Sequence, residues 1–168
     1  LTLPTPEQVL GGLPLSPAGT LVDDLDTYDL DFQHQFRPGT RNRVVWGFGY
    51  RRTHNVVGNA PGLAFDPPVL DRDLFHGFAQ NELVVTPSVA FTIGTKVEHN
   101  DYTGVEFEPN ARLRWNMTST QMLWAAVSRA VRMPSRVDRD ERLPTPGISP
   151  LVDNLLVGND DFVSETLI

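Results

Sequence analysis

Polar and apolar residues alternate along this chain with a period of two over several long segments. In the segment 27–37 the odd positions are all polar, and the even positions are Tyr28, Leu30, Phe32, His34 and Phe36. After a Pro-Gly pair, the segment 43–51 has small or charged residues on one face and Val44, Trp46, Phe48 and Tyr50 on the other. This period is that of a β-strand whose two faces meet different environments.

The same alternation predicts further strands. We expect strands at 27–37, 42–52, 73–85, 89–99, 105–115 and 121–131, the start of another at 162–168, and a loop over 1–26. The expected connections are tight at 38–42, 86–88 and 116–120, and longer at 53–72, 99–106 and 132–161. An up-and-down membrane barrel sorts short turns to one rim and long loops to the other. A Greek-key sandwich does not require this separation of short and long connections.

Strand length and aromatic content favour a protein of the membrane. Strands of ~9–11 residues with an aromatic-rich outer face are what a membrane-spanning β-barrel requires. We therefore predict an all-β, antiparallel up-and-down meander of six to seven long strands that is part of a transmembrane β-barrel. The positions expected to face lipid are Val44, Trp46, Phe48, Tyr50, Phe91, Ile93, Leu113 and Trp115. The alternative is a soluble β-sandwich binding module of the lectin-like kind.

Composition and charge exclude several other classes. The chain has no uninterrupted apolar window long enough to cross a bilayer as a helix, which argues against a helical membrane protein. Its formal charge of −7 provides no net positive field for the phosphates of a nucleic acid. It contains no cysteine, so neither disulfides nor cysteine-ligated metal sites are expected.

No motif in the sequence predicts an enzyme, a metal site or a cofactor. The four histidines are far apart, and the aspartates between positions 23 and 31 lack the glycine and closing glutamate of an EF-hand loop. Glu106 and Glu108 share one strand face, whereas a glycosidase places its two acids on opposite sides of the substrate. Nucleophile elbows, phosphate-binding glycine loops and zinc-protease motifs do not occur. We expect no catalytic residue, no metal and no cofactor.

Two stretches of the chain resemble the barrel of TonB-dependent outer-membrane receptors. They are residues 104–115 (GVEFEPNARLRW) and 123–136 (LWAAVSRAVRMPSR). Residues 78–82 and 96–102 resemble an earlier hairpin of that family, and residues 162–166 resemble the opening of its next strand. The similarity covers about residues 27–168 and implies a partial barrel in the bacterial outer membrane.

The resemblance also implies a function. Such receptors take up a scarce, bulky solute, such as an iron-siderophore complex, cobalamin or a carbohydrate, and are energised by the TonB system. The family's plug domain, TonB-contacting motif and terminal aromatic strand have no counterpart here, and its barrel has about 22 strands. We infer a piece of a longer protein that does not transport alone and that self-associates through its open strand edges. A structural barrel without energised transport is a further alternative.

An arginine-rich stretch is the strongest candidate for binding chemistry. It contains Arg129, Arg132, Arg136, Arg139 and Arg142, interleaved with Asp138, Asp140 and Glu141. Guanidinium groups bind carboxylates in a bidentate manner, so Arg129, Arg132 and Arg136 are candidate residues for an anionic ligand such as a ferric siderophore. Salt bridges to the neighbouring acids, or contact with lipopolysaccharide phosphates, are the alternative. We favour this alternative, because the opposite charges alternate locally and cancel.

Overall fold

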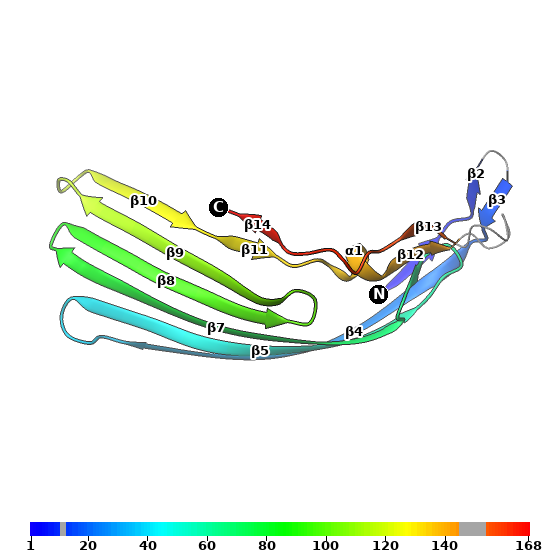
Figure 1. The fold of residues 1–168 in the computed structure, drawn as a ribbon, viewed down its shortest axis with the longest axis horizontal. Helices are drawn as coiled ribbons and strands as arrows, with labels where there is room; N and C mark the ends of the chain where they lie inside the picture. The colour runs from blue at the N-terminus through cyan, green and yellow to red at the C-terminus, as the bar shows by residue number, and fades with distance from the viewer. Residues whose placement is uncertain (11–12, 145–153) are drawn as a thin grey trace. The chain divides into compact units, whose positions relative to one another are not determined.

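The computed structural model describes residues 1–10, 13–144 and 154–168, and almost all of their regular structure is β-strand (Figure 1). The strands are β1 Thr2–Thr5, β2 Gln8–Leu10, β3 Leu13–Ser16, β4 Gly19–Phe36, β5 Asn42–Gly58, β6 Ala64–Phe65, β7 Val69–Thr86, β8 Val89–Asn100, β9 Gly104–Asn116, β10 Met122–Ser128, β11 Ala130–Arg132, β12 Glu141–Pro144, β13 Asn154–Val157 and β14 Glu165–Leu167. A short helix, α1, covers Arg136–Asp140. Within the described residues, no helix has the length and apolar character needed to cross a membrane.

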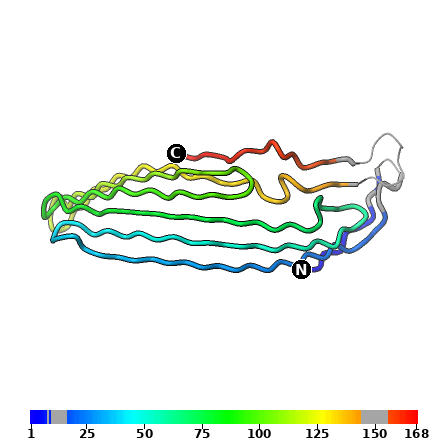
Figure 2. The backbone as a smooth tube through the Cα atoms, turned by 60° about the horizontal axis from the view of Figure 1, so that its bottom comes forward, coloured from blue at the N-terminus to red at the C-terminus, as the bar shows by residue number. Residues whose placement is uncertain are grey.

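The long strands form one seven-stranded sheet in the order β1-β4-β5-β7-β8-β9-β10. Figure 2 shows the chain running back and forth through these strands, and the paired neighbours β1–β4, β7–β8, β8–β9 and β9–β10 are antiparallel. Smaller sheets join β11 to β14, β2 to β3, and β12 to both β13 and β6. The predicted all-β antiparallel meander is therefore confirmed.

The chain divides into two compact units, which we describe separately. Unit 1 contains residues 1–28, 52–72 and 134–163, and unit 2 contains residues 29–51, 73–133 and 164–168. The strands β4, β5 and β7 contribute residues to both units.

The strand register of unit 2 gives its sheet two chemically different faces. Phe91 on β8 lies opposite Leu83 on β7 and Leu113 on β9, and the neighbouring rung pairs Thr92 with Glu82 and Arg112. The alternation in the sequence is thus in phase from strand to strand. We call the face that contains Phe91 the apolar face. On β7 to β10 it includes Phe75, Ala79, Leu83, Phe91, Ile93, Val97, Phe107, Leu113, Trp115 and Val127. We call the other face the polar face.

Aromatic contacts extend the apolar face onto β4 and β5. The ring of Phe32 lies 5.5 Å from that of Trp46 and 5.3 Å from that of Phe48, and Tyr50 stacks on Phe75 of β7 at 4.8 Å. The indole Nε1 of Trp46 lies 3.2 Å from Nδ1 of His34. The even positions of β4 and β5 therefore share one face with the odd positions of β7.

The phenylalanine pair Phe75 and Phe78, which fall on opposite faces of β7, is accommodated by a glycine on β5. A Cβ added at Gly47 would lie 2.7 Å from Cε1 of Phe78 and would also contact the carbonyl oxygen of Phe32. The glycine therefore leaves room for the Phe78 ring on the polar face, where a larger residue would clash.

Unit 1 has a small apolar core of its own. Leu21, Val57 and Ala60 are at most 5% exposed, and Leu63 and Phe65 pack against them. Across the described residues of the whole chain, the only other buried hydrophobic side chain is Ala90. A chain of this size that buries so few apolar side chains and exposes so many lacks the single core of a soluble domain.

The expected loop over residues 1–26 is wrong. The structure has β1, β2 and β3 there, and β4 begins at Gly19, where Leu3 pairs with Leu21. The prolines suggested a loop, but Pro4 lies on β1, which among the described strands is at the edge of the sheet and pairs with β4. Such an edge strand tolerates a residue that cannot donate a backbone hydrogen bond.

Several boundaries and connections also differ from the prediction. The connection expected at 99–106 is only residues 101–103, because Oδ1 of Asn100 accepts hydrogen bonds from the backbone N–H groups of Tyr102 and Thr103. Short and long connections therefore do not alternate strictly. The strand expected at 121–131 is interrupted at Arg129, whose N–H donates to the carbonyl oxygen of Pro109. The connection expected to be irregular at 132–161 contains α1, β12 and β13, and β14 covers three residues of 162–168.

Candidate functional site

The polar face of unit 2 holds a network of ion pairs. Nζ of Lys96 on β8 lies 2.6 Å from a carboxylate oxygen of Glu98 and 3.4 Å from one of Glu108 on β9. Glu82 on β7 pairs with Arg43 of β5 at 2.5 Å and with Arg114 of β9 at 3.8 Å. These charges lie on one side of the sheet and neutralise one another, which is what a solvated or protein-filled interior would allow and a lipid-facing surface would not.

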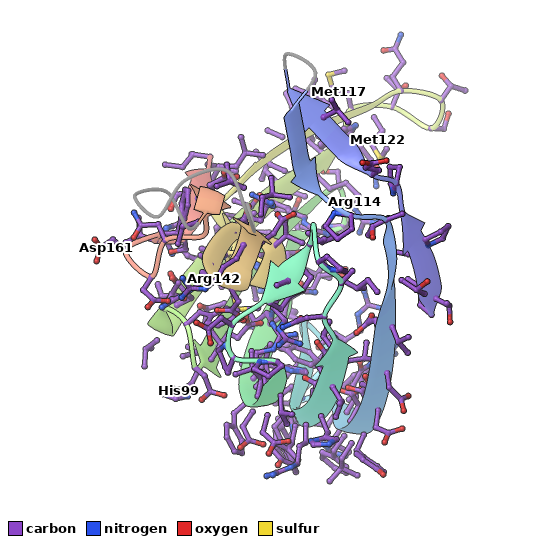
Figure 3. The ribbon with its side chains drawn as sticks, turned by 90° about the vertical axis from the view of Figure 1, so that its right-hand side faces the viewer. His99, Arg114, Met117, Met122, Arg142 and Asp161 are labelled. Carbon is purple, nitrogen blue, oxygen red and sulfur yellow. The ribbon has the colours of Figure 1, made fainter. Side chains whose placement is uncertain are left out.

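The same face continues onto β4 and β5. Nε of Arg51 lies 2.7 Å from Oδ1 of Asp29, and Nε2 of His76 lies 3.4 Å from Oδ1 of Asp31. A Cβ at Gly49 would contact both Asp31 and His76, so a glycine is needed for this close approach. Arg114 lies near the β9–β10 turn; the exposed Met117 of this turn and the exposed Met122 at the start of β10 are labelled in Figure 3.

Arg129 connects β9 to β14. Its guanidinium donates to the carbonyl oxygen of Phe107, donates to Oγ1 of Thr166 at 3.2 Å, and lies 3.6 Å from Oε2 of Glu106. Glu106 is 8% exposed and also accepts a hydrogen bond from the hydroxyl of Ser164. Arg129 is therefore held by contacts within unit 2.

Arg132 has a much more open environment. Its guanidinium lies 3.1 Å from Oε2 of Glu165, which is its direct partner in the β11–β14 ladder. The two side chains are 62% and 72% exposed. An ion pair as exposed as this one contributes little stability and leaves the guanidinium accessible to other groups.

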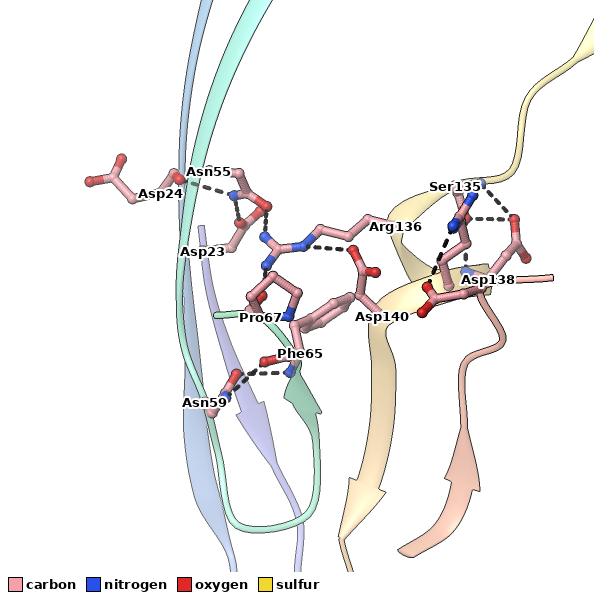
Figure 4. Close-up of polar contacts among 12 residues, drawn as sticks. Asp23, Asp24, Asn55, Asn59, Phe65, Pro67, Ser135, Arg136, Asp138 and Asp140 are labelled. Carbon is pink, nitrogen blue, oxygen red and sulfur yellow. Dashed lines mark hydrogen bonds and ion pairs between the residues drawn. The ribbon is translucent and has the colours of Figure 1, made fainter. Parts of the chain in front are cut away.

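Arg136 lies in unit 1 and is buried (Figure 4). Its guanidinium donates to Oδ1 of Asn55 and to the carbonyl oxygen of Pro67, and Nε lies 3.5 Å from Oδ2 of Asp140. The guanidinium also lies 5.2 Å from the centre of the Phe65 ring. Neither Asn55 nor Pro67 belongs to a recognisable motif, and no signal in the sequence pointed to them.

All five arginines of the predicted cluster pair with carboxylates. Arg136 pairs with Asp140 of the same stretch, and four pairs reach acids outside it: Arg129–Glu106, Arg132–Glu165, Arg139–Asp160 and Arg142–Asp66. Arg129 and Arg132 belong to unit 2, whereas Arg136 belongs to unit 1. A ligand role for the three candidates stays a prediction.

The net charge of the chain resides in unit 1. By sequence, unit 1 has twelve acidic side chains and five arginines, and unit 2 has nine acidic and nine basic side chains. Unit 1 therefore carries the whole formal charge of −7, and unit 2 is neutral. Arg142 and Asp161, labelled in Figure 3, both belong to the acidic unit. Among the described residues, no three His, Asp or Glu side chains are placed to hold a metal ion.

Comparison with known proteins gives a family and a fold. The sequence model described as "TonB dependent receptor-like, beta-barrel" matches residues 5–167. The structure resembles the siderophore receptor PirA from Acinetobacter baumannii, with a TM-score of 0.67 and 16% identity over 90% of this chain and 24% of that receptor. It also resembles PirA from Pseudomonas aeruginosa, with a TM-score of 0.65 and 15% identity over 89% of this chain and 29% of that receptor. A search of curated proteins found no match.

Proposed function

The chain belongs to the TonB-dependent receptor β-barrel family, and from this we propose that it is a barrel segment of a receptor for the energised uptake of a scarce solute. Membership in this family places it in the bacterial outer membrane. The chain spans about a quarter of the length of the solved receptors that it resembles. The plug, the contact with TonB and the remaining strands would come from outside this segment.

The observation that carries the proposal is the two-faced sheet of unit 2. Its apolar face exposes large side chains such as Phe48 at 49% and Ile93 at 57%, while its polar face is occupied by paired charges. From Val105 to Trp115 the outward positions of β9 span ten residue steps, or ~33 Å along the strand at ~3.3 Å per residue. With a strand tilt of ~40° this gives ~25 Å, which is the height of the apolar band of an outer-membrane barrel.

We propose that the apolar face contacts lipid through the eight predicted positions Val44, Trp46, Phe48, Tyr50, Phe91, Ile93, Leu113 and Trp115. Trp46, Phe48, Ile93, Leu113 and Trp115 are each 38–57% exposed. A shallow hollow of about 780 Å³ on this face is lined mainly by its apolar and small side chains, including Ala79, Ile93 and Phe107. Such a surface suits hydrocarbon chains.

For the solute, we propose an iron-siderophore complex. The two solved structures that support this are named siderophore receptors. Among the arginines, we assign any direct contact with the solute to Arg132, because its side chain is 62% exposed, against 31% for Arg129 and 8% for Arg136. The charge of −7 on unit 1 supports a second candidate solute. This is a neutral or cationic iron-siderophore complex rather than a polyanionic one.

Uptake by cells tests the transport proposal. Cells carrying the complete receptor, starved of iron, would be given radiolabelled ferric complexes of two kinds: a cationic trihydroxamate and an anionic tricatecholate. We expect accumulation of at least one complex, lost when the proton gradient is collapsed or TonB is deleted. Accumulation of neither complex would contradict the siderophore proposal. Uptake of either that persists without TonB would favour a structural barrel or passive pore.

We also propose that the chain by itself associates. Its exposed apolar face and its unpaired strand edges would be covered by another copy or by detergent. Light scattering without detergent should show particles larger than the 18.7 kDa monomer. A monodisperse monomer that unfolds cooperatively would instead support the soluble sandwich.

A further inference from the structure

The charges of unit 2 balance over the whole unit but not along the length of its strands. The β4–β5, β7–β8 and β9–β10 turns lie together at one end of its sheet (Figure 1). We call the part of unit 2 between these turns and one rung of the sheet the turn half. That rung is formed by Gln80, Gly94, Asn110 and Ser128.

The turn half has a large excess of positive charge. Its charged side chains are Arg37, Arg41, Arg43, Arg112, Arg114 and Glu82. The rest of unit 2 has four basic and eight acidic side chains. Unit 2 is therefore neutral as a whole but strongly polarised, with its positive end at the turns.

The positive charges of the turn half also lack partners within the chain. Glu82 is shared by two arginines, since it lies 2.5 Å from Arg43 and 3.8 Å from Arg114. The other three guanidinium groups of this half have no ion-pair partner among the residues that the structure describes. Every basic side chain in the rest of unit 2 does pair with a carboxylate; these are Arg51, Lys96, Arg129 and Arg132.

A hollow of about 280 Å³ opens on the polar face of the turn half, and Arg112, Arg114, Met122 and Trp124 contribute to its lining. The register places Trp124 opposite Arg114, so both side chains are on the polar face. Met122 and Trp124 are 57% and 68% exposed. Two large apolar side chains therefore lie exposed beside unpaired arginines, on the face where β7, β8 and β9 mostly carry polar residues.

We propose that the turn half of the polar face is a docking surface for an acidic polypeptide segment, which places an apolar side chain against Trp124. Tryptophan, methionine and arginine are the residue types enriched in protein interfaces, and tryptophan and arginine dominate their binding energy. The excess positive charge selects a partner rich in carboxylates. The hollow is smaller than the ~300–1,000 Å³ of a typical small-molecule site, which favours a polypeptide side chain over a bulky solute.

We assign the docked segment to the same receptor, outside residues 1–168. This assignment rests on the proposed function, because a polar face that forms the inside of a barrel is accessible only to what lies in the barrel interior. The chain covers 24% and 29% of the two solved receptors that it resembles, so most of a receptor of that size lies outside this segment.

Carbodiimide coupling in isolated outer membranes that contain the complete receptor tests for the carboxylate. The reagent joins an amine to a carboxylate in contact with it, and Arg112→Lys supplies an amine without a change of charge. Lys96 is the only lysine of this chain and is an internal control, because it lies 2.6 Å from Glu98 and 3.4 Å from Glu108. We expect mass spectrometry to find position 112 joined to an acidic peptide from outside residues 1–168.

Two results of this experiment would overturn the proposal. One is coupling of Lys96 to its neighbours with no coupling of position 112. The other is coupling of position 112 to Glu82 alone, which would show that the chain satisfies its own arginines.

A photoactivatable benzophenone amino acid at position 124 tests the apolar part of the surface, with a ferric tricatecholate added as the solute. Position 123 is the matched control, because Leu123 is 54% exposed but lies opposite Trp115 on the apolar face. We expect position 124 to link to the same acidic peptide and position 123 to link to lipid.

The pattern of links separates this proposal from the proposed function. Links from position 124 to the ferric complex, or only to residues 1–168, would overturn the docking surface while position 123 still reports a barrel. Links from both positions to lipid would overturn the docking surface together with the two-faced barrel.

Charge reversal tests whether the docking is electrostatic. In Arg112→Glu combined with Arg114→Glu, the yield of the link from position 124 to the acidic peptide should fall about tenfold, because attractive pairs are replaced by repulsive ones. Changing the acidic residues of the linked peptide to arginine should restore the yield, which repair of a misfolded barrel would not explain. An unchanged yield, or a loss that the compensating change does not restore, would overturn the proposal.

Discussion

Units 1 and 2 share three strands but differ in which side chains they bury and in the charge they carry. In unit 2 the strands keep a strict alternation, expose aromatic side chains such as Phe48 on one face, and pair charges on the other. In unit 1 two of these strands bury Leu21 and Val57, and the unit as a whole contains the buried Arg136 and carries the whole net charge of −7. One region is suited to lipid on one side, and the other is suited to water.

The comparison shows that two apolar side chains on the same barrel strand can both be exposed for different reasons. Phe48 and Val56 lie on β5 at positions of equal parity, and both are exposed, at 49% and 38%. We interpret the first as contact with lipid and the second as an ordinary surface residue, because only the first belongs to a continuous apolar face. The following substitutions, in order of expected effect, separate the two cases.

The largest expected effect is that of Phe48→Arg in the complete receptor. It should destabilise the folded state in lipid vesicles by ~2–4 kcal/mol, because a charge near the bilayer midplane loses its hydration. Val56→Arg is the control on the same strand and should change the folding free energy by less than ~0.5 kcal/mol. Equal costs, measured by denaturant titration, would remove the distinction between the units.

Gly47→Ala tests the crowding of the polar face. The added methyl group would meet Phe78 and the carbonyl oxygen of Phe32, so we expect a loss of ~1–3 kcal/mol in folding free energy. Gly77→Ala is the control, since a Cβ there would have only one neighbour, the carbonyl oxygen of Gly47 at 3.8 Å. It should cost less than ~0.5 kcal/mol. If both variants unfold at the same denaturant concentration, the two-faced packing is wrong.

Val57→Ala probes the small core of unit 1. Val57 is 5% exposed, and removal of two methyl groups should cost ~1–2 kcal/mol. We expect the loss to appear as faster hydrogen exchange in the first half of β4 and the second half of β5, with β8 and β9 unaffected. Val56→Ala, one residue away and exposed, should have no measurable effect. A uniform loss of protection in both units would mean that they do not behave as separate units.

The smallest expected effect is that of Arg132→Ala. The ion pair with Glu165 is exposed, so its loss should change the folding free energy by at most ~1 kcal/mol. If Arg132 contacts an anionic solute, the same variant should weaken binding of an anionic ferric complex more at low ionic strength than at high ionic strength. Unchanged binding of that complex at low ionic strength would assign Arg132 to contacts within the chain.

The sheet of unit 2 could be predicted from the sequence because each position there has one of two environments. The alternation from Tyr28 to Phe36 and from Val44 to Tyr50 reflects these two environments. The register between strands then follows, because it must keep apolar residues of neighbouring strands on the same face. The strand at Gly19 was missed because its first residues alternate weakly and follow several prolines. Strand pairing with β1, a long-range contact, decides the structure there.

The candidate site was less predictable than the fold. The arginine-rich stretch is visible in the sequence, but the partners of Arg129 and Arg136 include Glu106, Thr166, Asn55 and Pro67, which lie 23 to 81 residues away. Local alternation of Arg and Asp suggested local pairing, but four of the five arginines pair with a carboxylate outside the stretch. Side-chain partners at such separations leave no periodic signal in one sequence.

A scan of single cysteines along β5 tests the central claim most directly. The chain has no native cysteine, so a spin label at each position from 44 to 57 would be unique within this segment. In vesicles we predict that collision with oxygen, which concentrates in lipid, is high at positions 44, 46, 48 and 50, low at 45, 47 and 49, and low on both faces from 52 onward. Equal oxygen collision on both faces from 44 to 50, or alternation that continues unchanged to Val57, would contradict the account.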